Sequence, residues 1–317
     1  MPESQFVSII IPCKEINDYA NECIKYCRRL DYGNYEIILI PDSAPERIDG
    51  TRIVPSGPVT PGAKRNIGVA SSNGEVCAFI DSDAYPREDW LSNAVKYLNG
   101  EVVAVGGPGI TPPEDSLMQK ASGLVLSSVM VGGLSRRYKS KSSFFSDDIH
   151  SCNFVTKRNM VNKAGGWNEK YWPGEDTLFC LEIRRKGKKM IEASDVMVFH
   201  HRKPLFIPHL RQIFNFGLHR GFFAKKFRGN SAKPLYFIPF LLVMFLTICG
   251  LISLVNSLAT VFFLGFLAAY FLVVLVAALM ERRDLRLFPL VFSGVILTHL
   301  AYGIAFSEGL LKKSLKR

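Results

Sequence analysis

The stretch Cys77-Ala78-Phe79-Ile80-Asp81-Ser82-Asp83 decides the fold, because an apolar run with the length of a buried strand ends there in two carboxylates. Such a run is typical of a parallel strand that is covered on both faces, and open α/β sheets bind ligands at the carboxyl ends of these strands. Asp81 and Asp83 repel each other unless a cation lies between them. A hard divalent cation with oxygen ligands would satisfy both carboxylates and could also bind a diphosphate. The stretch therefore predicts a metal–nucleotide site at the edge of a sheet.

Apolar runs and helical patterns alternate around this stretch. Strands are predicted at 6–11, 35–40, 76–80 and 102–105, and helices at 19–30, 61–70, 87–98 and 176–186. Alternation at this spacing predicts an α/β domain with a parallel sheet and helices on both faces. The polar, serine-rich stretch 135–148 predicts a mobile loop, either a plain surface loop or a lid over an acceptor.

The C-terminal part of the chain is strongly apolar and accounts for the positive mean hydropathy of +0.14. The segments 235–256, 257–280 and 287–306 each approach the roughly 20 apolar residues that span a bilayer. The first two are predicted to form a hairpin that turns at Asn256-Ser257. The third is the most polar, so a re-entrant or surface position is an alternative to a third span. Three spans would also place the basic tail 312–317 on the side away from the α/β domain, against the positive-inside rule.

Charge indicates a membrane partner rather than nucleic acid. The net charge is +11, and many of the basic residues flank the apolar segments, which is the pattern of a membrane protein that faces an anionic leaflet. Residues 205–230 are amphipathic and basic, as in a helix lying among lipid headgroups. The seven cysteines are scattered, which is typical of reduced thiols in a cytosolic domain. No signal peptide is evident, so the soluble part is expected in the cytoplasm.

These patterns together predict three parts. They are an α/β domain at 1–204, an amphipathic interfacial helix at 205–230, and a membrane domain at 231–317 with two or three apolar helices. The protein is expected in the cell membrane as a multi-pass protein with a cytoplasmic α/β domain.

Several short motifs resemble those of one enzyme family. They are Val7-Ser8-Ile9-Ile10-Ile11-Pro12, Gly62-Ala63-Lys64-Arg65-Asn66-Ile67-Gly68, Asp81-Ser82-Asp83, Gly165-Gly166-Trp167-Asn168-Glu169, Gly174-Glu175-Asp176 and His200-His201-Arg202. In this order and spacing the chain resembles the family 2 glycosyltransferases that are non-processive and membrane-anchored, over about residues 6–220. The resemblance implies a GT-A fold, which is a Rossmann-like domain for nucleotide-diphospho-sugar transfer, followed by C-terminal transmembrane helices.

The resemblance implies a set of nucleotide-binding residues. They are Pro12, Glu15, Asp42, Lys64, Arg65, Asn66 and Asp81. The family usually carries an Asn-Glu pair shortly after the first strand, whereas this chain has Lys14-Glu15 at a shifted position. Asp42 matches the residue that contacts the base, and its alternative interpretation is a turn aspartate beside Pro41. The basic pair in the second motif could offset diphosphate charge, or it could lie on a solvated helix face.

The resemblance also implies a metal site with Mg²⁺ or Mn²⁺. Asp83 is the expected direct ligand, and Asp81 contacts the ribose or a metal-bound water. A histidine after a later strand often completes the metal shell in related enzymes, and either His200 or His201 fits. The sequence leaves open which of the two is the ligand.

Asp176 resembles the catalytic base of the family. A sugar hydroxyl becomes a good nucleophile only when a carboxylate takes its proton during attack. Glu175 precedes the base and could orient it or the acceptor; both acids would also suit a helix N-terminus. Gly166 and Trp167 are expected on the acceptor or donor-sugar side, with a core position as the alternative for the tryptophan.

The predicted function is inverting transfer of a sugar from a nucleotide-diphosphate donor, with a UDP-sugar as the family's commonest donor, to an acceptor presented by the membrane. A polyprenyl-diphosphate-linked glycan is the first choice of acceptor and polyprenyl phosphate the second. A processive synthase is disfavoured because no Gln-x-x-Arg-Trp motif follows Asp176. A sugar nucleotidyltransferase would need a Gly-x-Gly-Thr-Arg loop, and Pro12-Cys13-Lys14-Glu15 differs from it entirely. A non-catalytic membrane scaffold is the alternative from another class, and it predicts no loss on changing Asp83 or Asp176.

Overall fold

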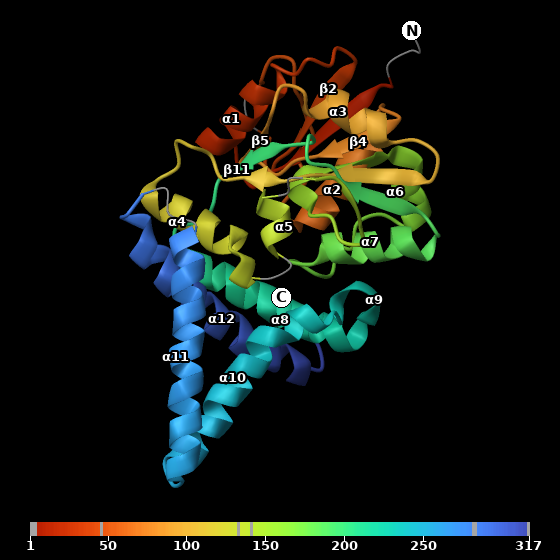
Figure 1. The fold of residues 1–317 in the computed structure, drawn as a ribbon. Coiled ribbons are helices and arrows are strands. Elements are labelled where there is room, and N and C mark those ends of the chain that lie inside the picture. Colours follow the sequence, from red (N-terminus) through yellow and green to blue (C-terminus); the bar gives the residue numbers. More distant parts are fainter. Residues whose placement is uncertain (1–4, 45–46, 132–133, 140–141, 281–283, 316–317) are drawn as a thin grey trace. The chain divides into compact units, whose positions relative to one another are not determined.

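The computed structural model describes residues 5–44, 47–131, 134–139, 142–280 and 284–315. Contacts divide the chain into two compact units (Figure 1). Unit 1 comprises Met1–Ile110 and Lys139–His201, and unit 2 comprises Thr111–Tyr138 and Arg202–Arg317. This division differs from the three predicted parts, because the helix within residues 111–138 packs against the C-terminal helices rather than within the sheet unit.

Unit 1 is built on an eight-stranded sheet. Its order is β3 (Arg52–Ile53), β2 (Tyr35–Ile40), β1 (Val7–Pro12), β4 (Val76–Phe79), β9 (Phe154–Lys157), β6 (Val102–Gly106), β10 (Lys189–Glu192) and β8 (Phe144–Ser146). Strands β1 to β4 pair in parallel, but β9 runs antiparallel to both β4 and β6, and β8 runs antiparallel to β10. The α/β class is confirmed, whereas the expectation of a wholly parallel sheet is wrong and the sheet is mixed.

Helices cover both faces of this sheet, as predicted. They are α1 (Asp18–Cys27), α2 (Pro61–Ala70), α3 (Trp90–Tyr97), α6 (Arg158–Ala164) and α7 (Glu175–Arg185). Side chains alternate along β1, so Ile9 and Ile11 enter one core cluster with residues of α1 and α3. Ile10 enters the other cluster with Val69 of α2 and Phe179 of α7. The carboxyl ends of β1, β2 and β4 thus lie between two packed layers.

Helix α2 is held unusually close to its neighbours. It begins at an N-cap, Thr60, whose hydroxyl accepts a hydrogen bond from the Ala63 amide at 3.2 Å, with Pro61 in the first turn. A Cβ on Gly68 would lie 2.4 Å from Ile10 Cγ2, and one on Gly62 would lie 2.5 Å from the Asn168 carbonyl oxygen. Both glycines therefore permit the close approach that brings this helix against β1 and the 165–169 segment.

A second, three-stranded sheet joins distant parts of unit 1. Its order is β5 (Ala84–Pro86), β11 (Val198–His200) and β7 (Gly109–Ile110). In the antiparallel pairing of β5 with β11, Ala84 lies opposite His200. Because Ala84 directly follows Asp83, this pairing places His200 beside Asp81 and Asp83, which together form the acidic edge of the sheet.

The stretch 135–148 is more regular than the predicted mobile loop. It contains most of α5 (Leu134–Lys139) and the whole of β8, which extends the sheet as an edge strand. Residues 140–141 lie outside the described part of the chain.

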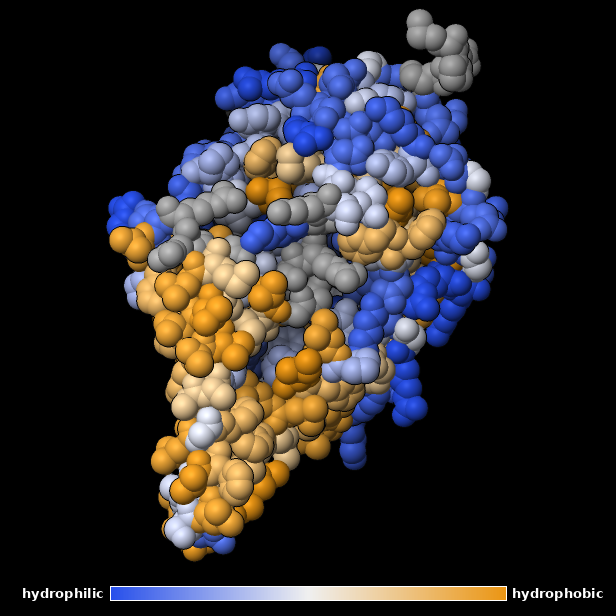
Figure 2. Space-filling model, viewed as in Figure 1, coloured by the Kyte–Doolittle hydropathy of each residue, from blue (hydrophilic) through white to orange (hydrophobic). Residues whose placement is uncertain are grey.

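Unit 2 is helical. It contains α4 (Leu117–Ser127), α8 (Ile207–Lys226), α9 (Arg228–Ser231), α10 (Pro234–Ser253), α11 (Ser257–Met280) and α12 (Leu287–Leu311). By length and composition α10, α11 and α12 are candidate membrane spans, with mean hydropathies of 2.5, 2.7 and 1.8. Figure 2 shows an almost continuous hydrophobic surface over the α10–α11 hairpin, as expected for residues that face lipid.

Candidate active site

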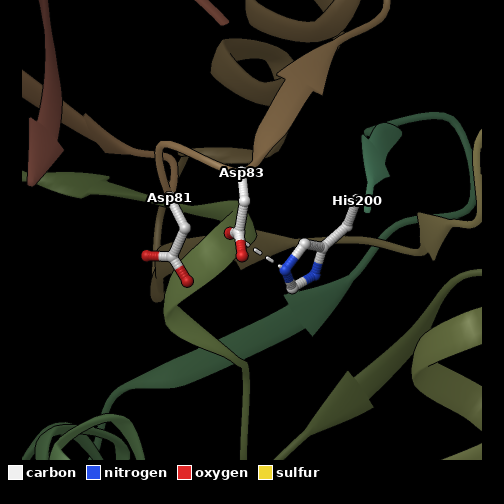
Figure 3. A group of neighbouring side chains, drawn as sticks. All are labelled: Asp81, Asp83 and His200. Atoms are coloured by element: carbon white, nitrogen blue, oxygen red, sulfur yellow. Dashed lines mark ion pairs between the residues drawn. The ribbon is translucent and has the colours of Figure 1, made fainter. Parts of the chain in front are cut away.

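The carboxylates of Asp81 and Asp83 lie beside the imidazole of one of the two adjacent histidines. Asp81 and Asp83 follow β4, and His200 ends β11 (Figure 3). One ligand atom from each of the three lies within 4.8 Å of the others, and His200 Nε2 is 3.2 Å from Asp83 Oδ1. Two carboxylates and an imidazole form a donor set that suits Mg²⁺ or Mn²⁺. The predicted clustering of these side chains is present.

The structure distinguishes the two adjacent histidines. Successive side chains of an extended segment point to opposite faces, so only one of them can face Asp83. His200 does so, whereas His201 Nε2 lies 2.8 Å from Glu22 Oε2 and the His201 ring packs on Tyr19 with centroids 4.5 Å apart. His201 is therefore placed in a packing contact with α1, and its predicted role as a metal ligand is not supported by its position.

The acidic edge favours positive charge. Burial lowers the pKa of His200, but the neighbouring Cys152 and Asp83 outweigh burial and raise that pKa to about 10. A divalent cation at this edge would have to replace the proton on His200, because an imidazole binds a metal only in its neutral form.

Arg65 connects the acidic edge to the start of α7. Its Nη2 donates to Asp81 Oδ1 at 2.6 Å and to Ser151 Oγ at 2.9 Å, while its Nη1 donates to Glu175 Oε1 at 2.8 Å. The Arg65 side chain is only 2 % exposed, and its guanidinium lies 5.0 Å from the centre of the Trp167 ring. One guanidinium therefore holds the carboxylates of two segments that are far apart in the sequence. Both terminal nitrogens of Arg65 thus have partners within the protein, whereas its buried Nε has none among the described residues. Contact of Arg65 with the diphosphate stays a prediction.

Glu175 and Asp176 open α7 in different environments. Glu175 is buried, and burial raises its pKa to about 7 although Arg65 acts to lower it and Asp176 adds to the rise. Asp176 is half-buried, and one of its carboxylate oxygens accepts the Thr177 amide at 2.7 Å. Glu175 is thus a buried anchor for Arg65, while Asp176 retains exposure that an acceptor hydroxyl would need.

Lys64 is the partner of the predicted base-contacting residue. Its ammonium lies 2.5 Å from Asp42 Oδ1 and 2.7 Å from Ser56 Oγ, and the side chain is 6 % exposed. The Asp42 amide also donates to the Lys14 carbonyl at 3.0 Å, which ties the loops after β1 and β2 together. Lys64 is therefore paired with Asp42 and orients that carboxylate. The sequence had instead suggested an ammonium that offsets the charge of the diphosphate.

Asn66 braces the glycine-rich turn after α6. Its amide donates to the Trp167 carbonyl at 2.9 Å and to Glu169 at 2.8 Å, and its oxygen accepts the Trp167 amide at 2.8 Å. Gly166 has a φ of +79°, and a Cβ there would lie 2.8 Å from Asn66 Oδ1. Asn66 thus supports this turn, and its direct contact with the nucleotide stays a prediction.

Trp167 is a core residue. It is 2 % exposed and stacks on Phe179 with ring centroids 4.5 Å apart, so its ring is not available to a sugar. The core position, which was the alternative interpretation of the sequence, is therefore the right one. Trp167 packs here with Phe79, Phe154 and Phe179 of the second core cluster.

The remaining predicted residues lie at the same edge of unit 1. Pro12 is buried at the end of β1, and Glu15 is exposed in the loop that follows. Ser151, which sequence reasoning missed, accepts a hydrogen bond from Arg65 and begins a short 3₁₀ helix, Ser151–Asn153. Nothing in its local sequence marks it, because its role comes from a partner 86 residues away.

Comparison with known proteins agrees with this architecture. Residues 8–164 match the model of the family described as Glycosyl transferase family 2. A mannosyltransferase, PcManGT from Pyrobaculum calidifontis, solved in complex with GDP-Man and Mn²⁺, superposes with a TM-score of 0.69 at 18 % identity over 99 % of this chain and 89 % of that one. The fold and the family match together define a nucleotide-sugar transferase with the GT-A fold. The chain belongs to the family 2 glycosyltransferases.

Two archaeal glycosyltransferases and one bacterial glycosyltransferase are similar to this chain in sequence. One, from Methanococcus voltae, is named dolichyl N-acetyl-alpha-D-glucosaminyl phosphate 3-beta-D-2,3-diacetamido-2,3-dideoxy-beta-D-glucuronosyltransferase; it is 22 % identical over 80 % of this chain and 85 % of its own length. The glycosyltransferase AglE of Haloferax volcanii is 22 % identical over 63 % of this chain and 68 % of its own. A pre-mycofactocin glycosyltransferase of Mycobacterium tuberculosis is 28 % identical over 55 % of this chain and 34 % of its own length.

Proposed function

We propose that this glycosyltransferase is metal-dependent and inverting, and that it extends a lipid-linked sugar at the cytoplasmic face of the cell membrane. The observation that carries the proposal is the position of Arg65, which contacts Asp81 at the acidic edge and Glu175 beside Asp176. Arg65 thereby joins two groups in one cluster of unit 1: the residues predicted to hold the donor and the residue predicted to activate the acceptor.

The proposed chemistry divides between the two ends of this cluster. Asp81, Asp83 and His200 would hold a divalent cation, which supplies positive charge for the departing nucleoside diphosphate. Asp176 takes the proton of the acceptor hydroxyl as that oxygen attacks the anomeric carbon from the face opposite the leaving group. The reacting carbon passes through an oxocarbenium-like state, and attack from the opposite face inverts its configuration. Glu175 and Arg65 keep the start of α7 fixed during this step.

The nucleotide is proposed from the surroundings of Asp42. The buried Lys64 fixes this carboxylate at the end of β2, so that it can accept hydrogen bonds from a base. Both uracil and guanine carry N–H donors. The mannosyltransferase neighbour was solved with GDP-Man, so the support extends to a nucleotide sugar and gives no preference to uridine.

A lipid-linked acceptor is supported by unit 2 and by one relative. The exposed apolar residues of α10 and α11 and the basic residues of α8 would bring the enzyme to an anionic membrane surface. The Methanococcus relative is named for action on a dolichyl-phosphate-linked sugar. By analogy we propose a polyprenyl carrier bearing a sugar, linked through phosphate or diphosphate, as the acceptor of this chain.

Purified full-length protein in lipid nanodiscs is the material for the direct test. We expect a UDP- or GDP-sugar from a donor panel to raise its thermal midpoint only when Mg²⁺ or Mn²⁺ is present. We also expect transfer from that donor to a sugar already linked to a polyprenyl carrier, detected by mass spectrometry of the lipid. Transfer to bare polyprenyl phosphate alone would replace the proposed acceptor, and the absence of transfer with every donor and acceptor would contradict the proposal.

His200→Gln is expected to weaken metal-dependent binding of the nucleoside diphosphate, as is Asp83→Ala, because each variant removes one member of the donor set. The matched control is His201→Gln, one residue away, which changes the contact with Glu22 and the ring packing on Tyr19 and Tyr85. Titration calorimetry with and without Mn²⁺ measures the difference. Equal loss of metal dependence in both histidine variants would reject the assignment of His200.

A further inference from the structure

We propose that unit 2 crosses the bilayer twice, through α10 and α11, and that α12 lies with α8 in the membrane interface on the side of unit 1. This inference rests on the membrane association proposed above and is independent of donor and acceptor. The α10–α11 hairpin would then contact lipid acyl chains, and the α8–α12 pair would contact lipid headgroups. By hydropathy alone α12 would count as a third span.

Helix α12 meets the hairpin at its open end. Its first half contacts the last part of α11, where Phe292 packs on Phe271 with ring centroids 6.4 Å apart. Its second half contacts the beginning of α10, where Phe306 packs on Phe237 at 4.9 Å. A third span running beside the hairpin would follow one helix along its length. Here α12 instead passes from the end of one helix to the start of the other, so it crosses the hairpin.

Close packing fixes α12 along α8. A Cβ on Gly217 would lie 2.6 Å from the Tyr302 carbonyl oxygen, and one on Gly221 would lie 2.1 Å from that of Phe306. Further along, Lys225 Nζ donates to the Leu310 carbonyl at 2.7 Å. Residue numbers rise together on both helices, so the two are parallel neighbours. Whatever depth α8 has in the membrane, α12 must share it.

Helix α8 is unsuited to the bilayer interior. It carries five basic or histidine residues besides His209 within twenty positions: Arg211, His219, Arg220, Lys225 and Lys226. Each charged residue at a bilayer centre costs about 2.5–3.5 kcal/mol on insertion scales. Because α12 is bound to this helix along its length, the α8–α12 pair belongs at the interface.

A buried polar contact joins α12 to two other helices of unit 2. His209 Nδ1 lies 2.7 Å from Ser122 Oγ of α4, and His209 Nε2 lies 2.9 Å from Thr298 Oγ1 of α12. The chain enters α4 from β7 of unit 1 and returns to unit 1 after α5, without passing through a candidate span. Helix α12 is therefore fastened to an element that stays on the side of unit 1.

This arrangement also removes the conflict over the basic tail. Two spans return the chain to the side of unit 1 before α12, so Lys312 and Lys313 lie on the same side as Lys225 and Lys226. The hairpin tip is the most exposed apolar part, with Val255 88 % and Leu254 79 % exposed. A 20-residue helix is about 30 Å long, enough to carry this tip across the hydrocarbon core.

The test is labelling of single introduced cysteines in membranes that contain the full chain. Glu88→Cys reports the side of unit 1, Val255→Cys the hairpin tip, and Ser314→Cys the segment after α12; all three positions are exposed. Sealed vesicles of both orientations are treated with a membrane-impermeant maleimide, and the unsubstituted chain measures labelling of its native cysteines. We expect the first and third variants to be labelled in one vesicle orientation and Val255→Cys in the other.

Two labelling results would overturn the inference. Labelling of Ser314→Cys together with Val255→Cys, opposite to Glu88→Cys, would show three spans. Labelling of all three in one orientation would show that the hairpin does not cross. Release of the chain from membranes by alkaline carbonate would contradict membrane insertion itself. Loss of sugar transfer with the expected labelling would count against the proposed function and leave the topology intact.

Discussion

Replacing Asp176 by Asn is expected to reduce sugar transfer by about 10²–10⁴-fold, the usual contribution of a general base, while the affinity for the nucleoside diphosphate stays nearly the same. The amide keeps the shape of the side chain, and its oxygen can still accept the Thr177 amide at the start of α7. It cannot take a proton from the acceptor hydroxyl. The effect should therefore appear in kcat rather than in donor binding.

The matched control for this variant is Glu182→Gln on the same helix. Glu182 pairs with Arg185 at 2.5 Å on an exposed surface, so removing its charge should leave transfer within a few-fold of the original rate. Single-turnover rates and calorimetry with the nucleoside diphosphate separate the two quantities. Normal turnover by Asp176→Asn would reject its role as base, and a parallel loss of nucleotide affinity would place it in the donor site.

Replacing Arg65 by Leu is expected to destabilise unit 1 by about 3–5 kcal/mol, the usual cost of removing one partner from a buried ion pair. The variant leaves the buried Glu175 carboxylate without the guanidinium that neutralises it. All three tryptophans of the chain, Trp90, Trp167 and Trp172, lie in unit 1. Urea unfolding followed by tryptophan fluorescence therefore measures unit 1 separately from the helices of unit 2.

A second variant separates charge from packing at this position. Combining Arg65→Leu with Glu175→Gln removes the unpaired charge, so the loss should shrink to about 1–3 kcal/mol, the cost of leaving the buried amide unsatisfied. Arg52→Leu is the control, because Arg52 is exposed, and we expect a change within about 0.5 kcal/mol. No recovery in the double variant would mean that the loss comes from packing against Trp167.

Local sequence predicted most elements of unit 1 but not their direction. The strand at 35–40 and the helix at 61–70 have the predicted bounds, because an apolar run and a Thr60-Pro61 helix start are local signals. Strand β9 was missed, and with it the mixed character of the sheet. Its residues Phe154–Lys157 form an ordinary short strand, and whether it runs parallel or antiparallel depends on the path of the chain before it.

In the site too, local motifs predicted which residues matter but not which distant residues they contact. The grouping of Asp81 and Asp83 with a histidine followed from motifs, and the structure bears out that grouping. The choice of His200 over His201 depended on the register of β11 with β5, which no local pattern contains. Lys64 and Arg65 were expected to face the diphosphate, yet both pair with carboxylates more than 15 residues away. Motifs identified the positions, but only the fold identified their partners.

Three consecutive residues of α2 are joined to four separate parts of the site. Lys64 holds Asp42, Arg65 holds Asp81 and Glu175, and Asn66 holds the turn at Trp167. Successive side chains of a helix diverge by about 100°, so a small rotation of α2 would displace all four partners at once. Engineering a new donor preference by grafting this segment from a relative would thus require transplanting the facing residues as well, as one inseparable set.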